Sequence, residues 1–347
     1  MAYLAMYRQW RPQLFSEVVG QGHVVRTLQN ALKAGQTAHA YLFAGPRGTG
    51  KTSVAKILAK ALNCSEGPAA EPCNRCTPCV EITSGSSLDV LEIDAASNRG
   101  IDEIRELREK ARYSPAHCRY KAYIVDEVHM LTTEAFNALL KTLEEPPAHV
   151  FFVLATTEPH RVPQTVLSRC QRFDFHRLAV PEISARLARV ASEHGLEADE
   201  KALSLIARRA EGSLRDALGL LEQVSSYAGP HITQATVEEV LGSATGDSLA
   251  RLTDAVLAGD APRALEGLGR LVDEGRDVAQ LAREWMGQLR NLLLLGAGCA
   301  PEEVGLGPEE ARAARAQATG AGEVAILRLL ELLGQAEAAL RWASQPR

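Results

Sequence analysis

The sequence has few aromatic residues, no long apolar run and no excess of positive charge. Phe, Trp and Tyr make up 5% of its 347 residues, and the net charge is −5. Such a chain is not a polycation that coats nucleic acid, so any nucleic-acid contact must be local or shared with other subunits. No apolar run reaches the roughly 18 residues of a membrane span, and no signal peptide is visible after Met1. We therefore expect a cytoplasmic protein with no membrane contact.

The chain has seven cysteines, an odd number, and without a secretion signal we expect metal binding or free thiols rather than disulfides. Four of them form a C-x8-C-x2-C-x2-C pattern in a Pro- and Gly-containing stretch: Cys64, Cys73, Cys76 and Cys79. Four thiolates suit a closed, tetrahedral and structural zinc site. An iron–sulfur cluster is the alternative, although Thr83 stands where the ferredoxin pattern has its next cysteine.

A glycine-rich stretch stands between an apolar run at 41–44 and a helical pattern from residue 53. Strand, loop and helix in this order predict a phosphate-binding loop, in which backbone N–H groups point at an anion. Lys51 would reach the β- and γ-phosphates, and the Thr52 hydroxyl would bind Mg²⁺. The expected nucleotide-contacting residues are Gly45, Pro46, Arg47, Gly48, Thr49, Gly50, Lys51, Thr52 and Ser53.

Strand and helix patterns alternate in the first half of the chain, which predicts an α/β fold with a parallel sheet covered by helices. The expected strands are 41–44, 90–93, 123–125 and 151–155, and the expected helices are 52–62, 102–111 and 134–143. After Arg177 only helical patterns remain, at 181–193, 201–210, 214–225 and 236–241. Residues 242–246 resemble a linker, and the rest of the chain is again expected to be helical.

Polar residues end two of the predicted strands. Asp126 would hold Mg²⁺ through water, and Glu127 would polarise a water molecule against the γ-phosphate. Thr157 would contact the γ-phosphate or that water, because ligands bind at the carboxyl ends of parallel strands. The alternative interpretations are a charged turn and a Thr that caps a turn.

Two arginines can act on phosphate. Arg169 lies in a Ser-Arg-Cys sequence and would reach the nucleotide of a neighbouring subunit. Arg215 lies in the first turn of a helix that Ser213 can cap, where it would face the nucleotide. A solvated surface role is equally compatible with the spacing of either arginine.

Two helix starts can bind a nucleic-acid backbone. They are Arg99, Gly100 and Ile101, ahead of the helix at 102–111, and Thr132 and Thr133, ahead of the helix at 134–143. Hydroxyls, backbone N–H groups and a nearby arginine suit phosphates without reading bases. Ordinary helix capping is the alternative.

These motifs together resemble the gamma/tau subunits of bacterial DNA polymerase III, AAA+ ATPases that drive the sliding-clamp loader. The resemblance runs from Tyr7 to about Leu241 and rests on 7–12, 15–21, 45–52, the four cysteines, 92–98, 126–130, 138–147, 155–159 and 168–170. Residues 243–347 match less distinctively.

The resemblance implies roles that spacing leaves open. Tyr7, Arg11, Val18 and Val19 would line the adenine pocket, and Thr157 would be the first nucleotide sensor. Arg169 would be the finger that acts in trans, and Arg215 would be the second sensor. The cofactors would be ATP, Mg²⁺ and Zn²⁺, and the helix starts would face primed DNA.

The implied division is an AAA+ nucleotide-binding domain at 1–178 with a zinc loop at 64–79, a helical lid at 179–242 and a helical collar at 243–347. The implied partners are other loader subunits in a hetero-pentamer, the sliding clamp and primed DNA. Tau-type members continue into tails that bind the replicative polymerase and helicase, and such a tail is not present before Arg347. The alternatives are a nucleotide-binding scaffold and a hexameric branch-migration helicase.

Overall fold

The computed structural model describes residues 5–241, 244–273, 277–304, 306 and 308–340. By its internal contacts the chain divides into two compact units, Met1–Thr236 and Val237–Arg347. The described residues include no helix that is long and apolar enough to cross a membrane.

The first unit is built on a parallel sheet of five strands in the order β2-β3-β4-β1-β5. The strands are β1 (Ala40–Ala44), β2 (Val90–Asp94), β3 (Lys121–Asp126), β4 (Val150–Thr156) and β5 (Gln171–Asp174). All residues of β1 and β4 are buried, as expected for apolar strands covered on both faces. The pairing registers align Ala44 with Thr156 and Asp94 with Asp126, so the carboxyl ends of these strands lie at one edge.

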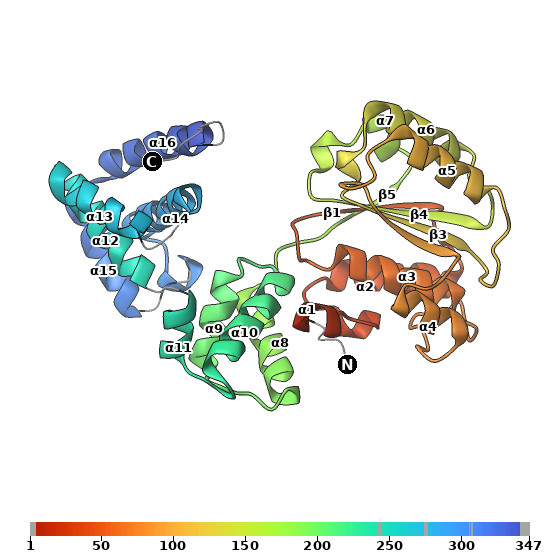
Figure 1. Cartoon of the computed structure of the whole chain (residues 1–347), viewed down its shortest axis with the longest axis horizontal. Helices are drawn as coiled ribbons and strands as arrows, with labels where there is room; N and C mark the ends of the chain where they lie inside the picture. The colour runs from red at the N-terminus through yellow and green to blue at the C-terminus, as the bar shows by residue number, and fades with distance from the viewer. Residues whose placement is uncertain (1–4, 242–243, 274–276, 305, 307, 341–347) are drawn as a thin grey trace. The chain divides into compact units, whose positions relative to one another are not determined.

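Helices cover both faces of this sheet (Figure 1). On one face lie α5 (Ile101–Ala111), α6 (Thr133–Glu144) and α7 (Gln164–Leu167), and on the other lie α2 (Gly22–Ala34), α3 (Lys51–Asn63) and α4 (Thr77–Ser84). Short elements accompany the sheet and its helices: α1 (Met6–Gln9), η1 (Phe15–Glu17), η2 (Val128–Met130) and η3 (Pro159–Arg161). The predicted parallel sheet covered by helices is confirmed.

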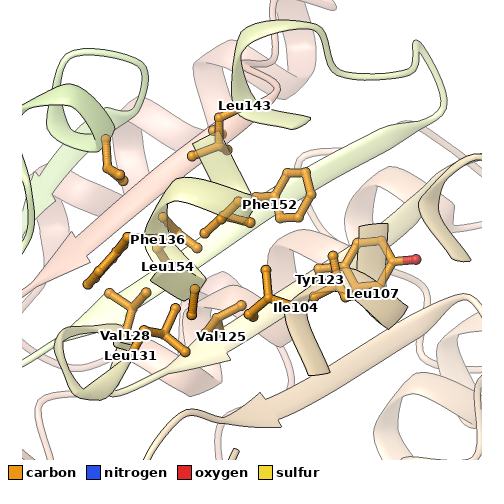
Figure 2. Packing of buried hydrophobic residues seen from close by; sticks show 14 of the residues in the cluster. Ile104, Leu107, Tyr123, Val125, Val128, Leu131, Phe136, Leu143, Phe152 and Leu154 are labelled. Carbon is orange, nitrogen blue, oxygen red and sulfur yellow. The ribbon is translucent and has the colours of Figure 1, made fainter. Parts of the chain in front are cut away.

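The core under α5 and α6 is aliphatic and aromatic (Figure 2). The Tyr123 ring of β3 stacks on the Phe152 ring of β4, with their centroids 5.4 Å apart. Ile104 and Leu107 of α5 pack against them, because residues three apart share one helix face. Each fully buried side chain of this size contributes about 1.5–3 kcal/mol, which fixes the sheet that positions the site.

The four expected strands and the three expected helices match the observed ranges to within one or two residues, whereas α4 at Thr77–Ser84 was not predicted. The sequence patterns missed β5, whose residues are exposed except for Phe173. An edge strand with one inward side chain has no apolar run to reveal it. The patterns also missed α2, although Val24, Leu28 and Leu32 recur on one buried face of that helix.

A group of helices follows the sheet within the first unit. It contains α8 (Val180–Glu193), α9 (Glu200–Arg209) and α10 (Leu214–Ala228), with two short paired strands, β6 (Glu197–Ala198) and β7 (His231–Ile232). The helix α11 (Gln234–Leu241) spans the boundary between the two units. The helical pattern expected after Arg177 is confirmed, and only the two short strands were not foreseen.

Every secondary-structure element described for the second unit is a helix. Its helices are α12 (Ala244–Leu257), α13 (Ala261–Asp273), α14 (Val278–Gly296), η4 (Pro301–Val304), α15 (Pro308–Ala321) and α16 (Glu323–Leu340). Leu249, Leu289 and Leu292 belong to its core, and the Trp285 indole N–H donates to Thr253 Oγ1 at 2.8 Å. The expected linker at 242–246 is wrong for its last three residues, because α12 begins at Ala244 and helical spacing prevails over the glycine at 246. Residues 242 and 243 of that linker lie outside the described residues.

Candidate functional site

The predicted phosphate loop joins the end of β1 to the start of α3. Gly45 and Gly48 have φ of 147° and 75°, values that side-chain-bearing residues rarely adopt. A Cβ on Gly48 would lie 1.9 Å from Ser213 Oγ, and one on Gly45 would lie 2.3 Å from the Phe175 carbonyl oxygen. The loop therefore needs glycine at both positions, for its conformation and for close packing. Its N–H groups lie at the positive end of α3, where an anion is stabilised.

Lys51 is held inside this loop. Its Nζ donates to the carbonyl oxygens of Gly45 at 2.7 Å and of Pro46 at 2.8 Å, and the residue is 6% exposed. Burial lowers the pKa of Lys51, and the nearby carboxylates of Glu127 and Asp126 oppose that change. The result is a positive charge in a poorly solvated loop, which is the setting in which a lysine attracts phosphate most strongly.

Thr52 and Asp126 meet across the edge of the sheet. Thr52 Oγ1, at the start of α3, donates to Asp126 Oδ2, at the end of β3, at 2.8 Å. A hydroxyl and a carboxylate side by side are oxygen donors of the kind Mg²⁺ takes when phosphates complete its shell. The two residues predicted as magnesium ligands are thus adjacent and suited to that ion.

Glu127 adopts a left-handed backbone conformation with φ of 48°. Such a conformation is uncommon for a residue with a side chain and is held here by its partners. Its Oε2 accepts from the Thr157 hydroxyl at 2.9 Å, and its own N–H donates to Asp126 Oδ1 at 3.0 Å. Thr157 therefore orients the carboxylate of Glu127, which lines the cavity described below.

His129 is a neighbour of Glu127 that the motif analysis did not assign a role. It is 8% exposed, with Nδ1 3.4 Å from Glu127 Oε2 and 3.1 Å from Thr156 Oγ1. Its Nε2 lies 3.3 Å from Glu158 Oε1. The imidazole thus bridges two carboxylates beside the carboxyl end of β4. The available signal was its position two residues after Asp126-Glu127, and a single histidine after a strand more often belongs to the core.

A cavity of about 410 Å³ lies over the loop. Tyr7, Arg11, Val18 and Val19, predicted to line an adenine pocket, all line this cavity. The other predicted residues in its wall are Arg47, Gly48, Thr49, Gly50, Lys51, Thr52, Ser53, Asp126, Glu127 and Arg215. The fold therefore brings most of the predicted site to one place.

The helices after the sheet contribute two arginines to this cavity. The Arg215 guanidinium, in the first turn of α10, lies over the Tyr7 ring at 4.8 Å from its centroid. Arg186 of α8 lies over the Trp10 ring at 5.5 Å. Trp10 also donates from Nε1 to His194 Nε2 at 2.8 Å. The sequence patterns did not identify Trp10 or Arg186, because these contacts join segments that are far apart in the chain.

Arg169 does not line this cavity. Its guanidinium pairs with Glu144 Oε1 at 2.8 Å and donates to the Thr165 carbonyl oxygen at 2.7 Å. Its side chain is 34% exposed, on a surface that follows α7. Arg169 therefore has no contact with the nucleotide cavity of its own chain.

The two predicted DNA-binding helix starts lie side by side. The Thr132 N–H donates to the Arg99 carbonyl oxygen at 3.2 Å, and Gly100 precedes the first residue of α5, Ile101. Thr132 also caps α6, because its Oγ1 accepts from the Ala135 N–H at 3.2 Å, and Thr133 is the first residue of that helix. The capping interpretation thus holds for Thr132, and the contiguity of the two segments provides a single surface.

The four cysteines of the 64–79 loop converge. Their sulfur atoms all lie within 4.8 Å of one another. The Cys73 N–H donates to Cys64 Sγ, and the Cys76 N–H donates to Cys73 Sγ, each at 3.4 Å. A tetrahedral ion with Zn–S bonds of about 2.3 Å needs sulfurs roughly 3.8 Å apart, so the cluster suits such an ion after a small contraction.

Known proteins match this chain along nearly its whole length. The family profile for "DNA polymerase III, delta subunit" matches residues 20–179, and that for "DNA polymerase III clamp loader subunit, ATPase lid domain" matches 182–229. The profile for "DNA polymerase III subunits gamma and tau domain III" matches 232–347. DNA polymerase III subunit gamma of Buchnera aphidicola is 42% identical over 82% of this chain and 79% of its own length. The chain belongs to the gamma/tau family of DNA polymerase III subunits.

Longer members of the gamma/tau family show the same similarity. Subunit tau of Bacillus subtilis is 44% identical over 100% of this chain and 62% of its own length. Subunit tau of Escherichia coli is 43% identical over 85% of this chain and 46% of its own length. The chain thus spans between about half and two thirds of these tau subunits.

Among solved structures, the Holliday junction branch migration motor RuvB of Thermotoga maritima aligns with a TM-score of 0.52 and 18% identity, over 72% of this chain and 79% of the other. At that identity the likeness concerns the fold alone. Together with the family profiles, it identifies an AAA+ P-loop ATPase fold with a helical lid, followed here by a helical C-terminal region.

Proposed function

We propose that this chain is the ATP-binding and ATP-hydrolysing motor subunit of a bacterial clamp loader. In this role it opens the sliding clamp and places it on primed DNA within the DNA polymerase III holoenzyme, in the cytoplasm. The observation that carries the proposal is a single cavity that holds the phosphate loop, the Thr52–Asp126 pair and Glu127, with Arg215 entering from the lid. Membership of the gamma/tau family supports the same function.

The residues of the cavity divide the work of hydrolysis. The loop N–H groups and Lys51 bind the phosphates, and Thr52 and Asp126 hold Mg²⁺, which neutralises charge on the β- and γ-phosphates. Glu127 orients and polarises the attacking water, and Thr157 keeps its carboxylate in position through the 2.9 Å hydrogen bond. Tyr7, Arg11, Val18 and Val19 enclose the base.

Arg169 and Arg215 connect this chemistry to other parts of the assembly. Arg169 has no contact with its own cavity and lies on the surface, which supports action on the ATP of a neighbouring subunit. Arg215 lies at the start of a lid helix, so it senses the nucleotide from the lid. The surface formed by Arg99, Gly100, Ile101, Thr132 and Thr133 contacts the backbone of primed DNA.

The cysteine cluster holds Zn²⁺ in a structural role. Cys64, Cys73, Cys76 and Cys79 supply four sulfur ligands and leave no open position for catalysis. The rest of the organisation follows the family. Residues 1–178 form the nucleotide-binding domain, 179–242 the lid and 243–347 a collar that joins the subunits of a hetero-pentamer, and longer forms reach polymerase and helicase through further segments.

Two other functions are less well supported. A scaffold that only binds nucleotide has no chemical need for Lys51, Glu127 and Arg169 together. A hexameric branch-migration helicase matches the fold of the RuvB motor at 18% identity, whereas the relatives above 40% are DNA polymerase III subunits. The mass of the assembly separates a mixed pentamer from a six-fold ring.

The deciding experiment measures ATP hydrolysis by the chain alone and then with the other loader subunits, sliding clamp and primed DNA. We expect weak activity alone, strong stimulation by the full set, and loss of the stimulation in Arg169→Ala. A high rate for the chain alone that is indifferent to clamp and DNA would refute a motor completed in trans.

A further inference from the structure

The cysteine loop is hydrogen-bonded to the chain segment that forms the base-side wall of the nucleotide cavity, which is the wall expected to enclose the adenine. The segment is 11–19, and its residues Arg11, Pro12, Glu17, Val18 and Val19 line the cavity. The loop is 64–79, which leaves α3 at Cys64 and returns through α4. The two meet through two buried or half-buried polar contacts.

The first contact is the carboxylate of Glu71, two residues before Cys73. Glu71 Oε2 accepts from the Phe15 N–H at 2.8 Å, and Glu71 Oε1 accepts from the Ser16 N–H at 3.0 Å. These are the first two N–H groups of η1, which have no partner within that short helix. Gln29 Nε2 donates to the same Oε1 at 3.0 Å and holds the carboxylate in place. Glu71 thus caps the turn that leads directly into Val18.

The second contact is Lys60, which is 1% exposed. Its Nζ donates to Gln13 Oε1 at 2.7 Å, to Asn74 Oδ1 at 2.8 Å and to Thr83 Oγ1 at 3.3 Å. Gln13 belongs to the cavity-wall segment, whereas Asn74 lies between Cys73 and Cys76. The buried Lys60 ammonium therefore joins the wall segment to the centre of the cysteine loop. Its hydrogen bonds form only when Gln13 and Asn74 are both in place.

The conformation of the loop depends in turn on its sulfur atoms. Asn74 has a left-handed backbone, with φ of 56°, between two N–H to sulfur hydrogen bonds at Cys73 and Cys76. A loop of this kind has no aliphatic core of its own, so four-sulfur metal binding is what would fix it. Loss of the metal would release Asn74 and Glu71 from the positions that hold the wall.

We propose that the cysteine loop braces the base-side wall of the nucleotide cavity, so that metal binding by the four cysteines sets nucleotide affinity through Glu71 and Lys60. Both are positioning residues, since neither lines the cavity. The proposal rests on the proposed function, in that it takes ATP as the ligand of the cavity and zinc as the ligand of the cysteines. It adds a regulatory link between the two sites.

The test compares Glu71→Ala with Glu66→Ala. Glu66 lies in the same loop and pairs with Arg75 at 2.6 Å on the surface. Its substitution therefore removes a carboxylate but leaves the contacts between the loop and segment 11–19 intact. Zinc content, the Kd of ATP by calorimetry and amide hydrogen exchange of residues 13–19 are measured for both variants and the original chain. We expect both variants to hold one zinc per chain. Glu71→Ala should bind ATP about three- to tenfold more weakly, because the competent wall is less populated.

The zinc-depleted original chain should resemble Glu71→Ala, with weaker ATP binding and faster exchange at Phe15 and Ser16. If depletion unfolds the chain, Glu71→Ala in its zinc-loaded form still tests the brace. Unchanged ATP affinity in that variant would overturn the proposal while leaving ATP binding itself intact. An original chain that binds no ATP would instead refute the proposed function, and one that binds ATP but no zinc would overturn the metal link.

Discussion

The two units of the chain differ in what they bury. Among the described residues, all the buried polar and charged side chains but one belong to Met1–Thr236, including Lys51, Lys60 and His129. The exception is Thr253, which bonds Trp285 inside a core of leucines. Burying a polar group costs free energy unless it is paired, so buried polar groups are expected mainly where they take part in binding or catalysis. The first unit is built around chemistry and the second around packing.

The largest expected effect tests the chemical side of this comparison. Lys51→Met removes the buried positive charge of the phosphate loop, and we expect the stimulated rate of ATP hydrolysis to fall by about 100-fold or more. Lys33→Met, at an exposed position of α2, is the control and should keep the rate of the original chain. A Lys51 variant with more than half of the normal rate would show that the buried ammonium has no catalytic purpose.

The packing side is tested at Leu289, which is fully buried in α14. Leu289→Ala should destabilise the second unit by about 2–5 kcal/mol, through lost burial and the cavity left behind. Urea unfolding followed by fluorescence measures this, and calorimetry should find the ATP affinity unaltered. Leu327→Ala, at a half-exposed position, should cost far less. Weakened ATP binding in Leu289→Ala would contradict the separation of roles.

The buried polar pair of Thr253 and Trp285 in the second unit provides a sharper test. Thr253→Val keeps the side-chain shape but leaves the Trp285 N–H without its acceptor, so we expect a loss of about 1–2 kcal/mol in the free energy of unfolding. Thr319→Val is the matched control, because that exposed hydroxyl also donates to the carbonyl four residues earlier. Equal effects of the two substitutions would mean that the buried pair contributes nothing beyond the helix bond.

The smallest expected effect concerns Tyr123 in the core shown in Figure 2, where its buried hydroxyl has no hydrogen-bond partner. Tyr123→Phe should stabilise the chain by about 1 kcal/mol at neutral pH. Burial raises the pKa of Tyr123 to about 12. Between about pH 10 and 12 the unfolded state therefore binds fewer protons than the folded state, and stability falls as pH rises.

Denaturation of both proteins from pH 9 to 12 checks this dependence. The decline should be less steep for Tyr123→Phe than for the original chain. Parallel pH curves would show that another group causes the alkaline loss of stability.

The phosphate loop and the cysteine cluster could be predicted from the sequence, because the residues of each site are close together along the chain and their spacing constrains the geometry. The buried strands could also be predicted from the sequence, because their apolar runs are continuous. The sequence could not show that Arg215 covers Tyr7 or that Arg186 covers Trp10, since these pairs form only when distant segments pack. It also gave no reason to single out Glu71, whose partners are backbone N–H groups that every residue possesses.

The trans role of Arg169 and the DNA contacts of Arg99 and Thr132 stay predictions, because a single chain has no partner in which to observe them. For Arg169, the fold shows only that this residue does not line the cavity of its own chain. For the DNA contacts, it shows that the two helix starts lie next to each other, joined by the hydrogen bond from the Thr132 N–H to the Arg99 carbonyl oxygen.

The phosphate loop and α10 are joined by a main-chain hydrogen bond, in which the Leu214 N–H donates to the Gly48 carbonyl oxygen at 3.2 Å, and the Ser213 side chain occupies the space that a side chain on Gly48 would need. Substitution of Gly48 cannot change this contact in small steps, because every other residue adds atoms where the Ser213 side chain already lies. Single substitutions can therefore change the walls of the cavity or the helices of the lid one side chain at a time, whereas any side chain at Gly48 would have to displace Ser213.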